Sequence, residues 1–108
     1  MSIKISVRKC REIPVVGIVG ELSGESVGKI AARLEKLRKL DNKTIAVDLS
    51  RTTFIDSHGL GVFVYCWRQL ENEQRNLVFV NPQGFILNMF RNTNLDRLFK
   101  VVDSLEAL

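Results

Sequence analysis

A serine between an aspartate and a histidine is the most chemically suggestive group in this 108-residue sequence. The segment reads Asp56-Ser57-His58-Gly59-Leu60-Gly61. An apolar strand-like stretch precedes it and an apolar helical pattern follows, so we expect Ser57 at or near a helix N-terminus. Unpaired backbone N–H groups and the helix dipole favour negative charge there. A phosphate on Ser57 would add a charge of roughly −1.5 to −2, and the helix start could accommodate it without unfolding the protein.

A purely structural interpretation of the same segment is also open. Ser57 would then cap the helix with its hydroxyl, and Asp56 would be a turn residue. Gly59 and Gly61 would serve the turn or the packing, whereas in the switch interpretation they let the backbone of a partner approach closely. The physical chemistry of the segment does not decide between the two.

Hydrolytic chemistry is the third interpretation, because Asp56, Ser57 and His58 are residue types of a catalytic triad. The base of a triad must reach the nucleophile and be oriented by a third group. His58 is the only histidine and directly follows Ser57, so it is poorly placed to do this. We therefore predict no catalytic residue and no cofactor. Two isolated cysteines, Cys10 and Cys66, also argue against a metal site or a disulfide framework.

The hydrophobic spacing places these residues between strands and helices. Alternation in the first twenty residues predicts a hairpin of two strands, the second over 13–19. Helical spacing follows over 24–40, with Ser23 as the expected N-cap. The next helix is expected from Ser57 to about Glu73, with Leu60, Val64, Trp67 and Leu70 along one face. The remaining expected elements are strands over 44–49, 76–80 and 100–102, a helix over 84–91 and a terminal helical turn over 104–108.

Composition restricts the class of protein. Hydrophobic residues make up 45% and charged residues 26%, which is typical of a globular chain. We expect one domain over 1–108, and we expect it in the cytoplasm, because no apolar run suits a signal peptide or a membrane span. The formal charge is +4, with basic residues at Lys36, Arg38, Lys39 and Lys43. These could bind nucleic acid, but we interpret them as the C-terminal end of a helix, where cations complement the dipole.

Four segments together resemble the STAS family, which takes its name from sulfate transporters and anti-sigma factor antagonists. The family pattern of aspartate, phosphorylatable serine, small residue and Gly-Leu-Gly is similar to residues 56–61. The others are Val19-Gly20-Glu21-Leu22, Asn81-Pro82 before a helix ending in Met89-Phe90, and Thr93-Asn94-Leu95-Asp96-Arg97-Leu98-Phe99. The resemblance covers nearly the whole chain. It implies an α/β fold with a mixed sheet of four to five strands and helices mainly on one side.

The resemblance also implies a partner-switching function. The unphosphorylated protein would bind an anti-sigma factor that is also a serine kinase, phosphorylation of Ser57 would dissociate the complex, and a metal-dependent serine phosphatase would reset it. The implied partner-binding residues are Ser23, Asp56, His58, Gly59, Leu60 and Gly61, with no nucleic acid or membrane as partner. The same serine is compatible with a STAS module of a non-sigma pathway, such as secretion, motility or second-messenger signalling, or with a soluble subunit of a lipid transporter.

Overall fold

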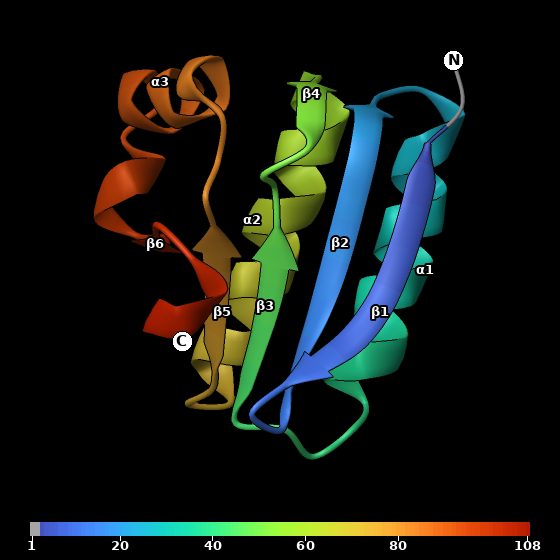
Figure 1. The fold of residues 1–108 in the computed structure, drawn as a ribbon, viewed down its shortest axis with the longest axis vertical. Helices are drawn as coiled ribbons and strands as arrows, with labels where there is room; N and C mark the ends of the chain where they lie inside the picture. Colours follow the sequence, from blue (N-terminus) through green and yellow to red (C-terminus); the bar gives the residue numbers. More distant parts are fainter. Residues whose placement is uncertain (1–2) are drawn as a thin grey trace.

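The computed structural model describes residues 3–108 and shows a mixed sheet with helices on one face (Figure 1). The strands are β1 (Lys4–Cys10), β2 (Ile13–Leu22), β3 (Thr44–Asp48), β4 (Thr52–Ile55), β5 (Asn76–Val80) and β6 (Lys100–Val102). The helices are α1 (Glu25–Arg38), α2 (Ser57–Asn72) and α3 (Gly84–Asn92), followed by short 3-10 turns at Leu95–Arg97 and Leu105–Ala107. Apart from the additional strand β4, the predicted order of strands and helices is confirmed.

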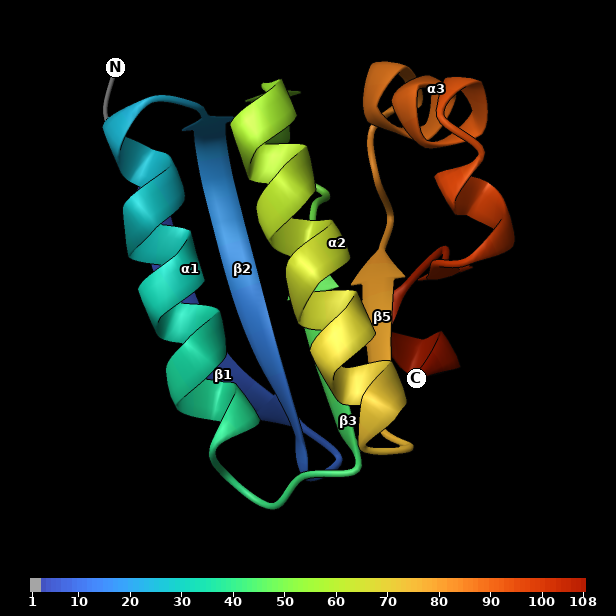
Figure 2. The same cartoon turned by 180° about the vertical axis from the view of Figure 1, so that it is seen from behind.

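The sheet has the order β1-β2-β3-β5-β6, and β4 pairs with β2 beyond the end of β3. Only the β1–β2 pair is antiparallel. Its two-residue turn, Arg11-Glu12, has positive φ at both positions, as type I′ hairpin turns require. Each later strand is parallel to its neighbours, so α1 and α2 are crossover helices that run in the same direction over one face (Figure 2).

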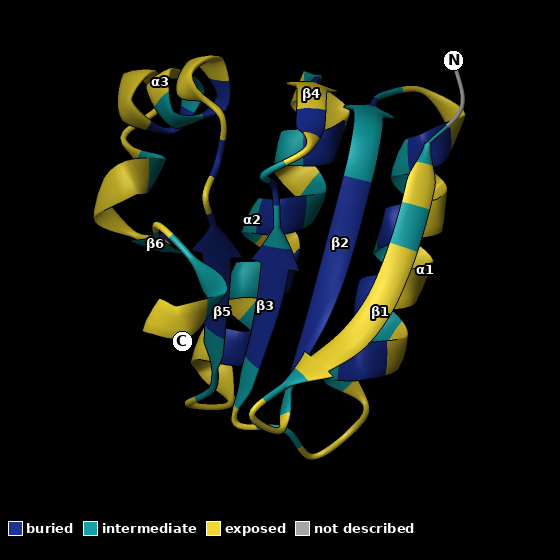
Figure 3. Cartoon of the chain, viewed as in Figure 1, coloured by how far each residue is buried: buried dark blue, intermediate teal, exposed yellow. Residues whose placement is uncertain are grey.

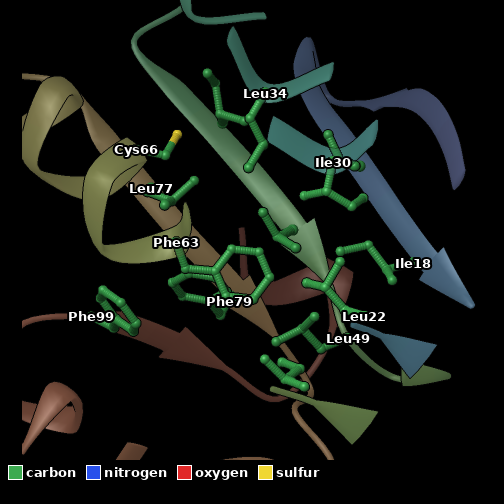
Figure 4. Close-up of a cluster of buried hydrophobic side chains, with 14 of the residues drawn as sticks. Ile18, Leu22, Ile30, Leu34, Leu49, Phe63, Cys66, Leu77, Phe79 and Phe99 are labelled. Carbon is green, nitrogen blue, oxygen red and sulfur yellow. The ribbon is translucent and has the colours of Figure 1, made fainter. Parts of the chain in front are cut away.

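The hydrophobic core lies between that face and the two crossover helices (Figure 4). The period of two along each strand sends alternate side chains to the helices, and the helical period of α1 and α2 returns side chains to meet them. The core is dominated by fully buried branched and aromatic residues, among them Ile18, Leu22, Ile30, Leu34, Phe63 and Phe79. The α/β prediction with helices mainly on one side is confirmed.

Two details of the helices differ from the sequence expectations. The residues of α2 that are most buried are Gly59, Phe63, Cys66 and Leu70, whereas the predicted stripe through Leu60, Val64 and Trp67 is only partly buried. That stripe forms one flank of α2, and the Trp67 ring lies 6.3 Å from the ring of Phe99. Leu70, the fourth residue of the predicted stripe, is buried as expected. A helix flat on a sheet buries a wide apolar band, so spacing alone identified Leu70 and one flank but missed Gly59, Phe63 and Cys66.

The N-cap of α1 is Gly24 and not Ser23, which corrects the second expectation. Gly24 has φ 54°, a conformation that favours glycine. No side chain within 3–108 caps α1; instead the hydroxyl of buried Ser26 accepts the Ser23 N–H at 2.9 Å and donates to the Ser23 carbonyl at 2.7 Å. The turn before α1 is therefore closed by a serine inside the helix.

The opposite face of the sheet is more exposed, above all along the edge strand β1 (Figure 3). A small second cluster lies on it, where the partly buried Leu105 and Leu108 pack over Val15, Ala46 and Val80. Arg11 donates to the Leu105 carbonyl at 2.7 Å and helps to fix this C-terminal segment. Within 3–108 no helix is long and apolar enough to cross a membrane.

The sheet of the described residues contains six strands, whereas four to five were expected. The additional strand is β4, into which the polar segment after β3 continues. Thr52, a polar residue outside every expected strand and helix, is fully buried. Its hydroxyl donates to the Ile18 carbonyl at 2.7 Å. This bond anchors the start of the short strand that leads directly to Ser57.

We predict that Thr52→Val lowers the free energy of unfolding by about 1 kcal/mol, because the shape is kept while a buried hydrogen bond is lost. Urea denaturation followed by circular dichroism measures the change. The exposed neighbour provides the control, since Thr53→Val should change stability by no more than about 0.5 kcal/mol. Equal stability of Thr52→Val and wild type would show that this bond does not hold β4.

Candidate functional site

Ser57 is the first residue of α2, and its side chain is exposed. The N-cap is Asp56, whose Oδ1 accepts the Gly59 N–H at 2.8 Å. The structural interpretation in which Ser57 itself caps the helix is therefore wrong. Since Asp56 does the capping, the Ser57 hydroxyl is left at the surface of the positive end of a helix of 16 residues.

The Asp56 carboxylate also connects α2 to the turn before α1. Its Oδ2 accepts the Gly24 N–H at 3.3 Å, and the Asp56 N–H donates to the Leu22 carbonyl at 3.1 Å. The hydrogen bond from Gly59 is the main cause that lowers the pKa of the Asp56 carboxyl below its usual value, with help from Gly24 and the nearby His58. The structure thus brings the Ser23–Gly24 turn and the Ser57 helix start together.

The two glycines after His58 have different environments. Gly59 is buried, and a Cβ there would lie 3.0 Å from the Leu22 Cγ and 3.1 Å from the Ile55 Cγ2. It lets the first turn of α2 lie close against β2 and β4, and so it offers no exposed surface to a partner. Gly61 is exposed, and a Cβ there would meet nothing within 4 Å. Leu60 is partly buried against the core.

The remaining expected site residues lie around the corner that the end of β2, the Ser23–Gly24 turn and the start of α2 form. His58 is exposed next to Ser57, and Ser23 is partly buried in the turn that Asp56 contacts. Phe54, three residues before Ser57, is exposed, and its ring stacks on the exposed ring of Phe85 of α3 with centroids 6.3 Å apart. Within 3–108 no cluster of potential ligands could hold a metal ion. Nothing in the geometry provides Ser57 with an oriented base.

A groove between α1 and α2 was not found from the sequence. It has a volume of about 630 Å³ and is lined by Ala31, Ala32 and Glu35 of α1 and by Ser57, His58, Gly61 and Tyr65 of α2, among others. We call it the α1–α2 groove. Ser57 is the lining residue nearest the start of α2. The signal for the groove was the small residues at 31, 32 and 61, but a one-dimensional pattern does not show that they face one another.

Comparisons with known proteins identify the family of this chain. The family model described as STAS domain matches residues 4–108. The chain belongs to the STAS family. An anti-sigma-B factor antagonist of Listeria monocytogenes is 27% identical over 101 residues, covering 94% of this chain and 88% of that protein. One of Staphylococcus aureus is 28% identical over 92 residues, covering 85% of each.

Solved STAS structures have the same fold. The anti-sigma factor antagonist SpoIIAA in its unphosphorylated form superposes with a TM-score of 0.77 at 24% identity, covering 96% of this chain and 92% of that one. An anti-sigma factor antagonist from Mycobacterium paratuberculosis has a TM-score of 0.89 at 20% identity, with coverage of 98% and 90%. SpoIIAA of Bacillus in the phosphorylated form has a TM-score of 0.76, also at 24% identity, covering 96% of each chain.

The two glycines of this STAS domain give a matched pair of substitutions. We predict that Gly59→Val destabilises the domain by about 1–3 kcal/mol, because the added atoms collide with Leu22 and Ile55. Gly61→Ala should stabilise it by about 0.5–1 kcal/mol, because alanine suits a helix interior better and meets no neighbour. Urea unfolding measures both. If both variants shift stability in the same direction, the packing role of Gly59 is refuted.

The cap makes a prediction about pH. Because folding lowers the pKa of Asp56, its ionised form contributes stability above the ordinary pKa of 3.8, and this is lost as pH falls through the lower pKa of the folded state. The stability difference between wild type and Asp56→Asn should therefore be largest near neutrality and shrink toward about pH 3. Urea midpoints across this range measure it, and a difference that grows on acidification would contradict the cap.

Proposed function

We propose that this STAS domain is an anti-sigma factor antagonist that is controlled by phosphorylation of Ser57. The unphosphorylated form binds an anti-sigma factor that is also a serine kinase. Phosphorylation ends the binding, and a metal-dependent serine phosphatase restores it. These partners are regulators of transcription, so the protein acts in the cytoplasm. The observation that carries the proposal is the exposed Ser57 hydroxyl at the start of α2, beside a cap supplied by another residue.

The names of the relatives support the choice of partner. The proteins from Listeria and Staphylococcus that align over most of this chain are named anti-sigma-B factor antagonists. They favour an anti-sigma factor over a transporter as the partner. The Bacillus SpoIIAA fold is known in both an unphosphorylated and a phosphorylated form, which supports a phosphate as compatible with this architecture.

In this proposal the domain is the substrate of its kinase and not an enzyme. The Ser57 Oγ attacks the γ-phosphorus of ATP, the bond from that phosphorus to the bridging oxygen of ADP breaks, and the hydroxyl proton goes to a base of the kinase. The phosphatase later transfers the phosphoryl group to water and releases inorganic phosphate. Since Ser57 and His58 are exposed neighbours with no third group to orient them, the domain lacks a base of its own for this chemistry.

The corner around Ser57 explains how the phosphate affects binding more than folding. At the first residue of α2, the new charge faces the positive end of the helix, which stabilises anions by about 0.3–1 kcal/mol. The Asp56 carboxylate next to it acts in the opposite direction. The fold therefore changes little in stability, whereas an interface built around a neutral hydroxyl receives a dianion. Asp56, His58, Leu60, Gly61 and Ser23 form the proposed contact surface together with Ser57.

We predict that the cognate kinase with ATP adds one phosphate to the wild-type protein and none to Ser57→Ala. Intact-mass spectrometry measures the incorporation, and circular dichroism checks that both proteins are folded. Modification of Ser57→Ala to the same extent would move the acceptor elsewhere and end the proposal.

We also predict that Ser57→Asp keeps the fold and binds the anti-sigma factor at least about tenfold more weakly, because a charge enters the interface without a partner. Isothermal titration calorimetry measures the affinity. Ser6→Asp is the control, because it adds the same charge to exposed Ser6 on β1. Equal affinities of Ser57→Asp and wild type would contradict the switch.

A further inference from the structure

The α1–α2 groove has the dimensions and chemistry of a helix-binding surface. Its lining runs along α2 from Ser57 to Cys66, which at 1.5 Å per residue is about 14 Å, or between two and three helical turns. Small side chains form much of its floor, since Ala31, Ala32 and Gly61 leave the two helix backbones open. Figure 2 shows α1 and α2 side by side on this face, and no other helix lies over them.

The charged residues inside and below the groove are already neutralised. Glu35 accepts from Arg38 at 2.6 Å, and Arg38 also pairs with Glu73 at 2.9 Å. Arg75 pairs with Glu73 at 2.7 Å and donates to the Arg38 carbonyl at 2.7 Å. Burial raises the pKa of the Cys66 thiol to about 11, so it remains protonated. The groove itself is therefore close to electrically neutral.

The exposed helix surface beside the groove, in contrast, carries three cations that are in no ion pair among the described residues, together with one exposed anion, Glu25, in the first turn of α1. Lys29 and Lys36 lie three residues before and four residues after Ala32, so they share its face of α1. Arg68 lies three residues after Tyr65 on α2. All three cations are exposed, and the ion pairs found within 3–108 use none of them. A neutral, largely apolar groove flanked by three cations and one anion carries a positive charge beside it, which is complementary to an amphipathic helix with acidic flanks.

We propose that the α1–α2 groove binds an acidic amphipathic helix of a partner protein. The apolar face of that helix lies on Ala32, Gly61 and Tyr65, and its acidic flanks face Lys29, Lys36 and Arg68. An apolar floor favours a protein helix over a nucleic acid, which would need only the cations. Assigning this helix to the anti-sigma factor rests on the function proposed above, whereas the chemistry of the groove does not.

The location of Ser57 connects this surface to the switch. Ser57 and His58 line the same groove, at the end where α2 begins. A phosphate on Ser57 would place negative charge at the end of a surface that selects for negative charge. It would therefore repel the acidic helix directly, in addition to altering the contacts of Asp56 and His58. Phosphorylation of Ser57 would thus act both on the α1–α2 groove and on the contact surface around Asp56 and His58.

The first experiment uses a synthetic probe and needs no natural partner. Two peptides are titrated into the isotopically labelled protein and followed by NMR: a capped amphipathic helix with leucines on one face and glutamates on its flanks, and the isomer with lysines in place of glutamates. We expect the acidic peptide alone to shift the amides of Ala31, Ala32, Gly61 and Tyr65. Absence of shifts, shifts elsewhere, equal shifts with the basic peptide, or displacement of the peptide by a short RNA oligonucleotide would overturn the proposal.

The second experiment uses the purified anti-sigma factor and calorimetry. Ala32→Trp fills the groove from an exposed position, and Lys29→Glu with Lys36→Glu reverses the charge of two of the three cations beside it. We expect each to weaken binding about tenfold. Lys4→Glu with Lys9→Glu on β1 makes the same change in net charge on exposed residues of the edge strand, and should leave the affinity within about twofold. Circular dichroism confirms folding in every case.

The outcomes separate the two proposals. If the groove variants bind like wild type while Ser57→Asp binds weakly, the anti-sigma factor does not use the groove, and this inference fails while the switch stands. If the wild type does not bind the anti-sigma factor at all but the acidic peptide maps to the groove, the function proposed above fails and the helix-binding surface stands.

Discussion

The carboxylate of Asp56 is the interaction on which the proposed switch depends. It holds the N–H groups of Gly59 and Gly24, and its own N–H is bonded to the Leu22 carbonyl. The end of β2, the start of α1 and the start of α2 thus form one fixed corner. Ser57 lies between the capping residue and the first turn of the helix, so its backbone is held on both sides. A modification of its hydroxyl can change the surface while the corner keeps its geometry.

This corner also shows how far sequence reasoning reached. The start of a helix at Ser57 was predictable, because an apolar strand-like stretch and a polar segment give way there to helical spacing of apolar residues. Which of Asp56 and Ser57 caps the helix was not predictable, since aspartate and serine are both good N-caps. Only the coordinates show that the Asp56 side chain makes the bond. Likewise Gly59 and Gly61 look equivalent in the sequence, and the contact of Gly59 with Leu22, far away in the chain, distinguishes them.

The features that were missed all depend on tertiary neighbours. The four residues of β4 are too few for a periodic pattern, and their pairing with β2 became visible only in the fold. The nucleic-acid interpretation, which the sequence analysis did not favour, rested on a cluster of basic residues at the end of α1. In the structure Arg38 of this cluster is in ion pairs with Glu35 and Glu73, and Lys43 donates to the Gln74 carbonyl. Lys36 of the same cluster is in no ion pair within 3–108, and with Lys29 it lies on the exposed surface of α1 beside the α1–α2 groove.

A useful phosphoswitch must respond strongly in binding and weakly in folding, and the electrostatics of this corner favour that combination. In the free domain the phosphate is exposed to water, where screening keeps its interaction with Asp56 small. The helix start stabilises the phosphate by about 0.3–1 kcal/mol, so the free energy of unfolding changes little. In a complex the same charge is removed from water. Like charges that face each other across an interface cost several kcal/mol, and each 1.4 kcal/mol changes the affinity tenfold. The difference arises because the partner excludes water from Ser57. An acidic helix in the adjoining α1–α2 groove would increase it further, since the phosphate would then oppose charges of its own sign on the partner as well as Asp56 on its own chain.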